Sequence, residues 1–197
     1  MLNIAVLVSG GGTNLQAILD SQARGEIADG KVTLVVSSKP DVYALERAKA
    51  AGVPTAVVSR KDYAAAADFD AALTAVLKEN RIDLVVLAGF LSVLGETVIA
   101  AYPNRIINVH PALIPSFCGS GMYGLRPHIA CLERGCKVTG ATVHFVNEEC
   151  DGGPILLQKA VAVLPNDTPE TLQRRVMEEA EWQLLPQAIA MICRGEA

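Results

Sequence analysis

Short apolar runs alternate along this chain with longer stretches in which apolar residues recur every three or four positions. The runs are rich in Val, Ile and Leu, as in strands buried within a parallel sheet, and they predict strands at 2–8, 31–37, 54–59, 81–88 and 105–110. The helical spacing predicts helices that start near residue 14 and that cover 41–51, 62–80, 95–101 and 125–135. Strands that alternate with helices, without an internal repeat, predict an α/β fold with a doubly wound, mostly parallel sheet.

The C-terminal half departs from this alternation. Residues 137–146 and 155–163 both have strand patterns, and the turn-rich acidic segment between them predicts an antiparallel hairpin at one side of the sheet. Thr168 followed by Pro169 is a typical helix start, so a long C-terminal helix is expected from there to about Arg194. No linker-like stretch interrupts the pattern, and we expect a single domain over residues 1–197.

The overall composition narrows the functional classes. Hydrophobic residues make up 51% of the chain and charged residues 19%, which excludes a mainly disordered protein. The net charge of −4 argues against nucleic-acid binding, which normally shows a basic surface. No run approaches the roughly 18 apolar residues of a membrane helix, so a cytoplasmic protein without a membrane partner is expected. The five cysteines show no CxxC spacing, and neither a zinc site nor a disulfide framework is predicted.

A glycine-rich turn, Ser9-Gly-Gly-Gly-Thr-Asn14, joins the first predicted strand to the first helix. Backbone N–H groups of such a turn, together with the helix dipole, form a typical anion-binding geometry. Leu15 stands where the dinucleotide fingerprint needs its third glycine, and no Gly-Lys-Ser/Thr follows as in a P-loop. A single phosphate is therefore the predicted ligand, and an ordinary tight turn is the alternative.

Asn108 and His110 lie two positions apart at the end of the predicted strand 105–110. Side chains two apart on a strand point to the same side of the sheet. The carboxyl ends of parallel strands form the ligand-binding edge of such sheets, so this pair, the glycine turn and Gly89–Leu94 are expected at one edge. The alternative is a strand end whose polar groups are simply hydrogen-bonded. Residues 116–124 hold several glycines and are expected to form a mobile loop near that edge.

Four motifs occur in a fixed order: the glycine turn, Leu87-Ala-Gly-Phe90, Asn108-Val-His110-Pro-Ala-Leu-Ile-Pro115, and His144-Phe-Val followed by Asp151-Gly-Gly-Pro154. Each motif alone is weak, but together they resemble the glycinamide ribonucleotide formyltransferases of purine synthesis over nearly the whole chain. The resemblance implies a Rossmann-like formyltransferase fold. It also implies transfer of a formyl group from 10-formyltetrahydrofolate to the amine of 5'-phosphoribosylglycinamide, without a metal.

The resemblance also implies residue roles. Asn108 and protonated His110 would hold the developing oxyanion, while Asp151 would orient His110 and assist proton transfer. The ribonucleotide would be held by Gly12, Thr13, Asn14 and Glu181. The folate would lie against Leu91, Ser92, Val93, Leu94, Asn147, Glu148, Glu149 and Cys150. Residues 1–101 would then be the ribonucleotide phosphate-binding half and residues 102–197 the catalytic and folate-binding half, in a monomer or homodimer that acts on small molecules.

Several of these residues have simpler interpretations. Leu91, Val93 and Leu94 are also compatible with core packing, Glu181 with a solvated helix position, and Asp151 with turn chemistry alone. His144 is expected to support the site structurally, and a surface position is the default for His128. The chain also departs from the family pattern, with Ala66, Ser92, Ala112 and Trp182 at positions where Arg, Arg, Ser and His are frequent.

Three other functions compete with this interpretation. A formyltetrahydrofolate hydrolase uses a similar Asn, His and Asp set but usually carries an extra N-terminal regulatory domain. A methionyl-tRNA formyltransferase needs a further domain and a basic surface, which a net charge of −4 does not favour. A non-catalytic module that binds a nucleotide phosphate would not require Asn108, His110 and Asp151 together.

Overall fold

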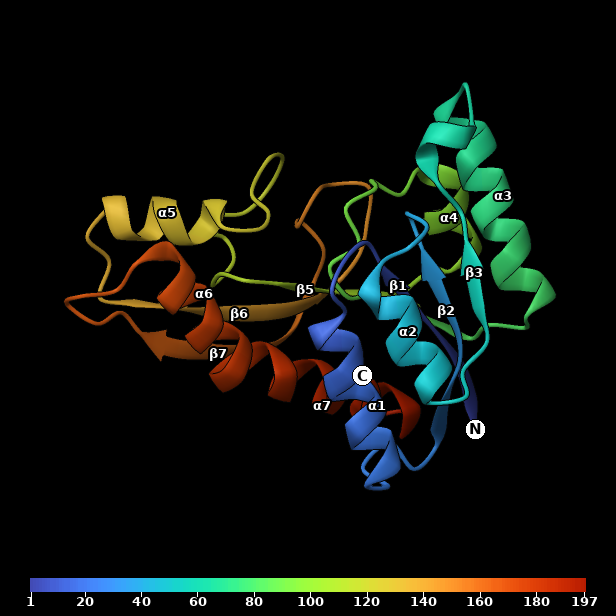
Figure 1. The fold of residues 1–197 in the computed structure, drawn as a ribbon, viewed down its shortest axis with the longest axis horizontal. Helices are drawn as coiled ribbons and strands as arrows, with labels where there is room; N and C mark the ends of the chain where they lie inside the picture. The colour runs from blue at the N-terminus through green and yellow to red at the C-terminus, as the bar shows by residue number, and fades with distance from the viewer.

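The structure is a computed structural model that describes all 197 residues. Its centre is one seven-stranded sheet with the order β3-β2-β1-β4-β5-β6-β7 (Figure 1). The strands are β1 (Leu2–Val8), β2 (Gly30–Ser37), β3 (Thr55–Val57), β4 (Leu84–Leu87), β5 (Ile106–His110), β6 (Val138–Phe145) and β7 (Ile155–Ala162). Strands β1 to β5 are parallel to one another, whereas β6 is antiparallel to β5 and β7 is antiparallel to β6. The predicted fold class and the predicted hairpin are confirmed.

Helices cover both faces of the sheet. They are α1 (Thr13–Ala23), α2 (Tyr43–Ala50), α3 (Ala66–Glu79), α4 (Glu96–Ala101), α5 (Arg126–Glu133), α6 (Pro169–Val176) and α7 (Trp182–Cys193). One core joins the sheet to α1, α2, α5, α6 and α7, and a smaller core joins it to α3 and α4. Because both faces of the sheet are covered, successive strand residues are buried on one face or the other. This explains the continuous apolar runs of the strands.

The smaller core does not extend along the whole sheet. It includes residues of β1, β2, β4 and β5, but none of β6 or β7. Ile106 of β5 belongs to it, whereas Ile107 and Val109 belong to the larger core. By strand alternation, Asn108 and His110 lie on the same side as Ile106. Both side chains therefore lie on the face of the sheet to which α3 and α4 pack, next to the part over β6 and β7 that these helices leave open.

Some predicted boundaries are wrong. The helix expected from residue 62 begins at Ala66, because a short 3₁₀ turn, Arg60–Asp62, and extended Tyr63 precede it. The strand expected from residue 81 begins at Leu84, because Arg81 takes a positive φ of 52° and its N–H bonds to Lys78 at the end of α3.

The C-terminal helix is interrupted once. Thr168 caps α6 as predicted, in a reciprocal pair with Thr171. Met177–Glu181 then forms a π-helical turn between α6 and α7. Such a turn accommodates one extra residue within a helix and is frequent at functional sites. It gives Glu181 a direction that a continuous α-helix would not.

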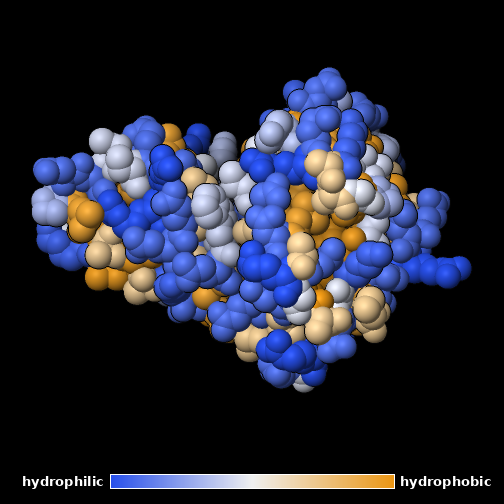
Figure 2. All heavy atoms as spheres, turned by 60° about the horizontal axis from the view of Figure 1, so that its bottom comes forward, coloured by the Kyte–Doolittle hydropathy of each residue, from blue (hydrophilic) through white to orange (hydrophobic).

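The face shown in Figure 2 is mostly hydrophilic, with apolar atoms gathered in a few places between the polar ones. Large exposed apolar side chains include Leu91, Val93, Val138 and Leu164. None of the helices combines the length and the apolar character needed to cross a membrane.

Candidate active site

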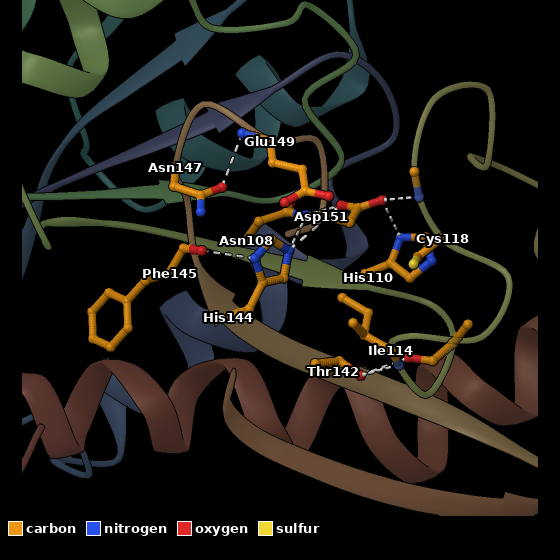
Figure 3. Close-up of polar contacts among 12 residues, drawn as sticks. Asn108, His110, Ile114, Cys118, Thr142, His144, Phe145, Asn147, Glu149 and Asp151 are labelled. Atoms are coloured by element: carbon orange, nitrogen blue, oxygen red, sulfur yellow. Dashed lines mark hydrogen bonds and ion pairs between the residues drawn. The ribbon is translucent and has the colours of Figure 1, made fainter. Parts of the chain in front are cut away.

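Four polar side chains meet at the carboxyl end of β5 (Figure 3). Asn108 and His110 come from β5 and His144 from β6, and the antiparallel register places Asn108 directly opposite His144. Asp151, from the loop between β6 and β7, reaches all three: its carboxylate lies 3.5 Å from Asn108 Nδ2, 3.4 Å from His110 Nδ1 and 3.5 Å from His144 Nε2. The three residues expected to act together are therefore brought together.

Asp151 is held by more than the turn in which it lies. Its backbone has a positive φ of 57°, which is uncommon for a residue with a side chain and is found at functional sites. Its Oδ2 accepts a hydrogen bond from Gly119 N–H at 2.9 Å. Burial alone would raise the pKa of Asp151, but His144, the Gly119 N–H and His110 together lower it below its usual value. The carboxylate is thus charged at neutral pH.

His110 is almost completely buried, with 3% of its surface exposed. Its Nε2 donates to the Phe117 carbonyl at 2.9 Å, which leaves Nδ1 as the nitrogen facing Asp151. Burial lowers the pKa of His110 below its usual value, although Asp151 and the Phe117 carbonyl act in the opposite direction. The lowered pKa favours the neutral form of His110 in the protein without substrate, because desolvation outweighs the single nearby carboxylate. A protonated His110 during the reaction stays a prediction.

His144 orients the Asn108 side chain. Its Nδ1 faces the Phe145 carbonyl at 2.8 Å, and a carbonyl can only accept, so Nδ1 carries the proton. In the neutral ring, Nε2 then accepts from Asn108 Nδ2 at 3.2 Å. This bond directs the second N–H of the amide toward Asp151 at 3.5 Å. The predicted supporting role of His144 agrees with these contacts.

The glycine turn has the features of an anion site. The carbonyls of Gly10 and Gly12 accept from Ala44 N–H at 3.1 Å and Gln16 N–H at 2.9 Å, whereas the N–H groups of Gly11 and Gly12 make no hydrogen bond. Gly12 precedes α1 with a φ of 73°. Free N–H groups at a helix start are the usual ligands of phosphate.

Glu181 reaches this turn from the C-terminal helix. Its carboxylate accepts from Asn14 Nδ2 at 2.8 Å, and only 6% of Glu181 is exposed. Burial raises its pKa to about 7, although Asn14 lowers it in part. Asn14 Oδ1 is buried without a partner, which leaves an acceptor for a ligand. The interpretation of Glu181 as a solvated helix residue is wrong.

The segment expected to contact folate divides into two parts. Leu94 is buried in the smaller core, as the simpler interpretation held, but Leu91 is 54% exposed and Val93 84% exposed. Ser92 lies between these two exposed residues. The other predicted folate segment, Asn147–Cys150, is an exposed loop that leads into Asp151. The two segments therefore offer exposed side chains from separate parts of the chain.

The expected surface position of His128 is wrong, because the side chain is buried. It has no exposed surface, neither ring nitrogen has a partner, and burial lowers its pKa to about 4. Its spacing to Cys131 and Leu132 is that of one helix face, and this was the sequence signal for burial. Sequence reasoning also missed Ser9 as a link between segments, because its role depends on a contact 82 residues away.

The departures from the family pattern lie in different environments. Ala112 is 1% exposed and its carbonyl accepts from Thr142 Oγ1 at 2.7 Å. Ala66 is exposed at the start of α3, and Trp182 is partly buried beside Glu181. None of the three belongs to the Asn108, His110 and Asp151 cluster.

Comparison with known proteins identifies the family. The formyl transferase family model matches residues 2–189. The chain is 40% identical to phosphoribosylglycinamide formyltransferase of Haemophilus influenzae, over 99% of this chain and 89% of that protein. It is 43% identical to the trifunctional purine biosynthetic protein adenosine-3 of Drosophila melanogaster, but spans only 14% of that protein.

A solved structure shows the same fold. Glycinamide ribonucleotide transformylase 1 from Symbiobacterium toebii superimposes with a TM-score of 0.93 at 46% identity, covering 99% of this chain and 89% of that one. The match in both sequence and fold over almost the full length shows that the chain belongs to the formyl transferase family, within which it is similar to the phosphoribosylglycinamide formyltransferases.

Proposed function

We propose that this protein transfers the formyl group of 10-formyltetrahydrofolate to the amine of 5'-phosphoribosylglycinamide, giving formylglycinamide ribonucleotide and tetrahydrofolate in purine biosynthesis. The observation that carries the proposal is the convergence of Asn108, His110 and Asp151 at the carboxyl end of β5, on the edge of the sheet where β1 leads into the glycine turn. The similarity to proteins named phosphoribosylglycinamide formyltransferase supports the choice of substrates. Positioning two substrates in attack geometry removes a large part of the entropic barrier to such a transfer.

Asn108 and His110 act as donors to the oxyanion that develops when the amine attacks the formyl carbon. Asn108 Nδ2 is oriented by His144, and its long contact to Asp151 is the one that an oxyanion replaces. Once it is protonated, His110 donates from Nδ1, because the proton on its Nε2 is already bonded to the Phe117 carbonyl. Preorganised donors in a site poor in water stabilise such charge strongly.

Asp151 accepts the proton that leaves the attacking amine and passes it toward His110. Its lowered pKa keeps it in the basic form, and the 3.4 Å contact to His110 Nδ1 gives the proton a route. His110 thereby gains its positive charge as the oxyanion forms, rather than before substrate binds. The proton finally goes to the folate nitrogen that loses the formyl group.

The ribonucleotide is held by the glycine turn and Glu181. The free N–H groups near Gly12 and Thr13 bind its phosphate, and Asn14 with Glu181 binds its hydroxyl-bearing part. Exposed Leu91 and Val93 suit the flat face of the pterin ring of the folate, the compound that supplies the formyl group. Ser92, buried Leu94 and the loop Asn147–Cys150 complete that wall.

In this proposal, residues 1–101 form the ribonucleotide phosphate-binding half and residues 102–197 the catalytic and folate-binding half of one domain. The enzyme works in the cytoplasm on small molecules, as a monomer or homodimer. No group of three or more His, Cys, Asp or Glu side chains is arranged to hold a metal ion.

The test is an absorbance assay of tetrahydrofolate formation with and without 5'-phosphoribosylglycinamide. We expect turnover only when the ribonucleotide is present, and formylglycinamide ribonucleotide as the product by mass spectrometry. Turnover without it, with release of formate, would instead indicate a hydrolase. Binding of both compounds without turnover would indicate a non-catalytic module.

A further inference from the structure

Arg47 of α2 reaches across to the glycine turn. Its Nε donates to the Gly11 carbonyl at 2.8 Å, and its Nη1 donates to Gln16 Oε1 at 2.9 Å. The guanidinium also lies over the Tyr43 ring, 4.8 Å from the ring centroid. One side chain therefore connects the glycine turn to the first turn of α1.

The charge of Arg47 is not neutralised by these contacts. None of its partners is a carboxylate, and it forms no ion pair, whereas Arg24, Arg174, Arg175 and Arg194 each do. Ordering a long arginine side chain costs about 2 kcal/mol of rotamer entropy. In a chain with a net charge of −4, an unpaired cation ordered beside free N–H groups favours an anion at that place.

The contact to Gly11 also sets a direction. The carbonyls of Gly10 and Gly12 are held by backbone N–H groups, and the Gly11 carbonyl is held by Arg47 alone. In a planar trans peptide, the C=O and N–H groups point in opposite directions. Holding the Gly11 carbonyl therefore turns the Gly12 N–H away from α2, toward the open side of the turn.

We propose that Arg47 is a positioning residue for the phosphate group of the substrate. It fixes the peptide plane between Gly11 and Gly12, and it adds positive potential to the turn. The close packing of α2 supports this, since a Cβ on Gly12 would lie 2.7 Å from Ala44 Cβ. The identity of the phosphate as that of a ribonucleotide rests on the proposed function.

The test compares Arg47→Ala with Lys49→Ala. Lys49 lies on the same helix and carries the same charge, but its ammonium pairs with Glu46 at 2.8 Å on the exposed surface. Loss of a charged hydrogen bond predicts that Arg47→Ala raises the ribonucleotide KM about tenfold or more. The kcat and the folate KM should stay near the wild-type values. The Kd for inorganic phosphate, measured by calorimetry, should rise by a similar factor, and Lys49→Ala should change neither quantity.

Arg47→Lys separates the two contributions. It keeps the charge but not the fork that bridges Gly11 and Gln16, so an intermediate rise in the phosphate Kd is expected. A wild-type phosphate Kd in Arg47→Lys would overturn the positioning role, and this variant also serves if Arg47→Ala does not fold. An equal rise in Lys49→Ala, or a wild-type protein that binds no phosphate, would overturn the inference as a whole. A wild-type protein that binds phosphate but transfers no formyl group would instead contradict the proposed function.

Discussion

The hydroxyl group of Ser9 accepts a hydrogen bond from the backbone N–H of Leu91 at 2.9 Å. Ser9 follows β1 and Leu91 lies beyond β4, and the two strands are neighbours in the sheet. One hydrogen bond therefore joins the glycine turn to the exposed apolar segment. The proposed ribonucleotide and folate sites share this link.

Replacing Ser9 with Ala is expected to weaken both sites. The Leu91 N–H would lose its partner in a partly buried place, which costs about 1–3 kcal/mol. We predict that the KM of the folate rises about fivefold or more and that the KM of the ribonucleotide rises with it. Ser38→Ala is the control, because Ser38 bonds to the Ser9 hydroxyl at 2.6 Å but not to Leu91. Steady-state kinetics with each substrate varied in turn would measure the effect, and a change confined to the ribonucleotide would contradict it.

Asn108→Ala is expected to reduce kcat by about 10²–10³-fold, the usual loss for one oxyanion donor. The ribonucleotide KM should stay close to wild type, because Asn108 lies away from the glycine turn. Asn80→Ala is a suitable control, since Asn80 caps the end of α3 and bonds only to Val76. A kcat near wild type in Asn108→Ala would remove Asn108 from the mechanism.

Asp151→Asn keeps the shape of the side chain but removes its charge and its ability to accept a proton. We predict a fall in kcat of about 10²-fold or more with little change in ribonucleotide KM. Because the pKa of Asp151 is lowered, the wild-type carboxylate stays ionised through mildly acidic pH. A pH–rate profile down to pH 5 should therefore show no loss of kcat assignable to Asp151. A loss that disappears in Asp151→Asn would contradict this assignment.

Glu181→Gln is expected to stabilise the protein at alkaline pH while weakening ribonucleotide binding. The folded pKa of Glu181 is about 7 against a usual 4.5, so its contribution to stability is complete below pH 4.5 and is lost as pH rises through 7. The free energy of unfolding of the Gln variant should exceed that of wild type by up to about 3 kcal/mol at pH 8, with a smaller difference at pH 5. Urea unfolding at the two pH values measures this, and an equal difference at both would refute it.

His128→Leu is expected to remove an acid-sensitive element. The folded pKa of about 4 lies below the usual 6.5, so the unfolded chain binds the proton more readily. The contribution of His128 to stability is complete above pH 6.5 and is lost as pH falls toward 4, by up to about 3 kcal/mol. Urea unfolding from pH 7 to 5 should show a smaller loss for the Leu variant than for wild type. Arg134→Leu, near the exposed end of α5, is the control for an apolar replacement.

Regular, deeply buried elements were predictable from the sequence. The strand 2–8 was predicted with the bounds that the structure has, because every residue from Ile4 to Val8 is buried and the pattern has no exposed gap. The hairpin and the Thr168 cap depend on local turn chemistry, which the sequence also carries. The start of α3 was misplaced because Ala64–Ala67 has no capping side chain to mark it.

The residues of the candidate site were predictable from the sequence, but their protonation states and contacts were not. Asn108 and His110 follow from strand alternation, whereas the position of Asp151 depends on a loop conformation with positive φ. The neutral form favoured for His110 depends on burial, which outweighs the opposite effects of Asp151 and the Phe117 carbonyl, and a motif contains none of these contacts. For the same reason, the partners of Ser9 and Arg47 appear only in three dimensions.

The π-helical turn at Met177–Glu181 changes which side chains of the C-terminal helix face the sheet. A continuous α-helix that starts with Leu172 and Val176 facing the sheet would bring positions 183 and 187 to the same side, yet Gln183 and Gln187 are exposed. Leu184 and Ala188 are buried instead. The helix thus has two phases that differ by about 100° of rotation. Deleting one residue from this turn would merge the phases, forcing either Glu181 away from Asn14 or the glutamines into the core.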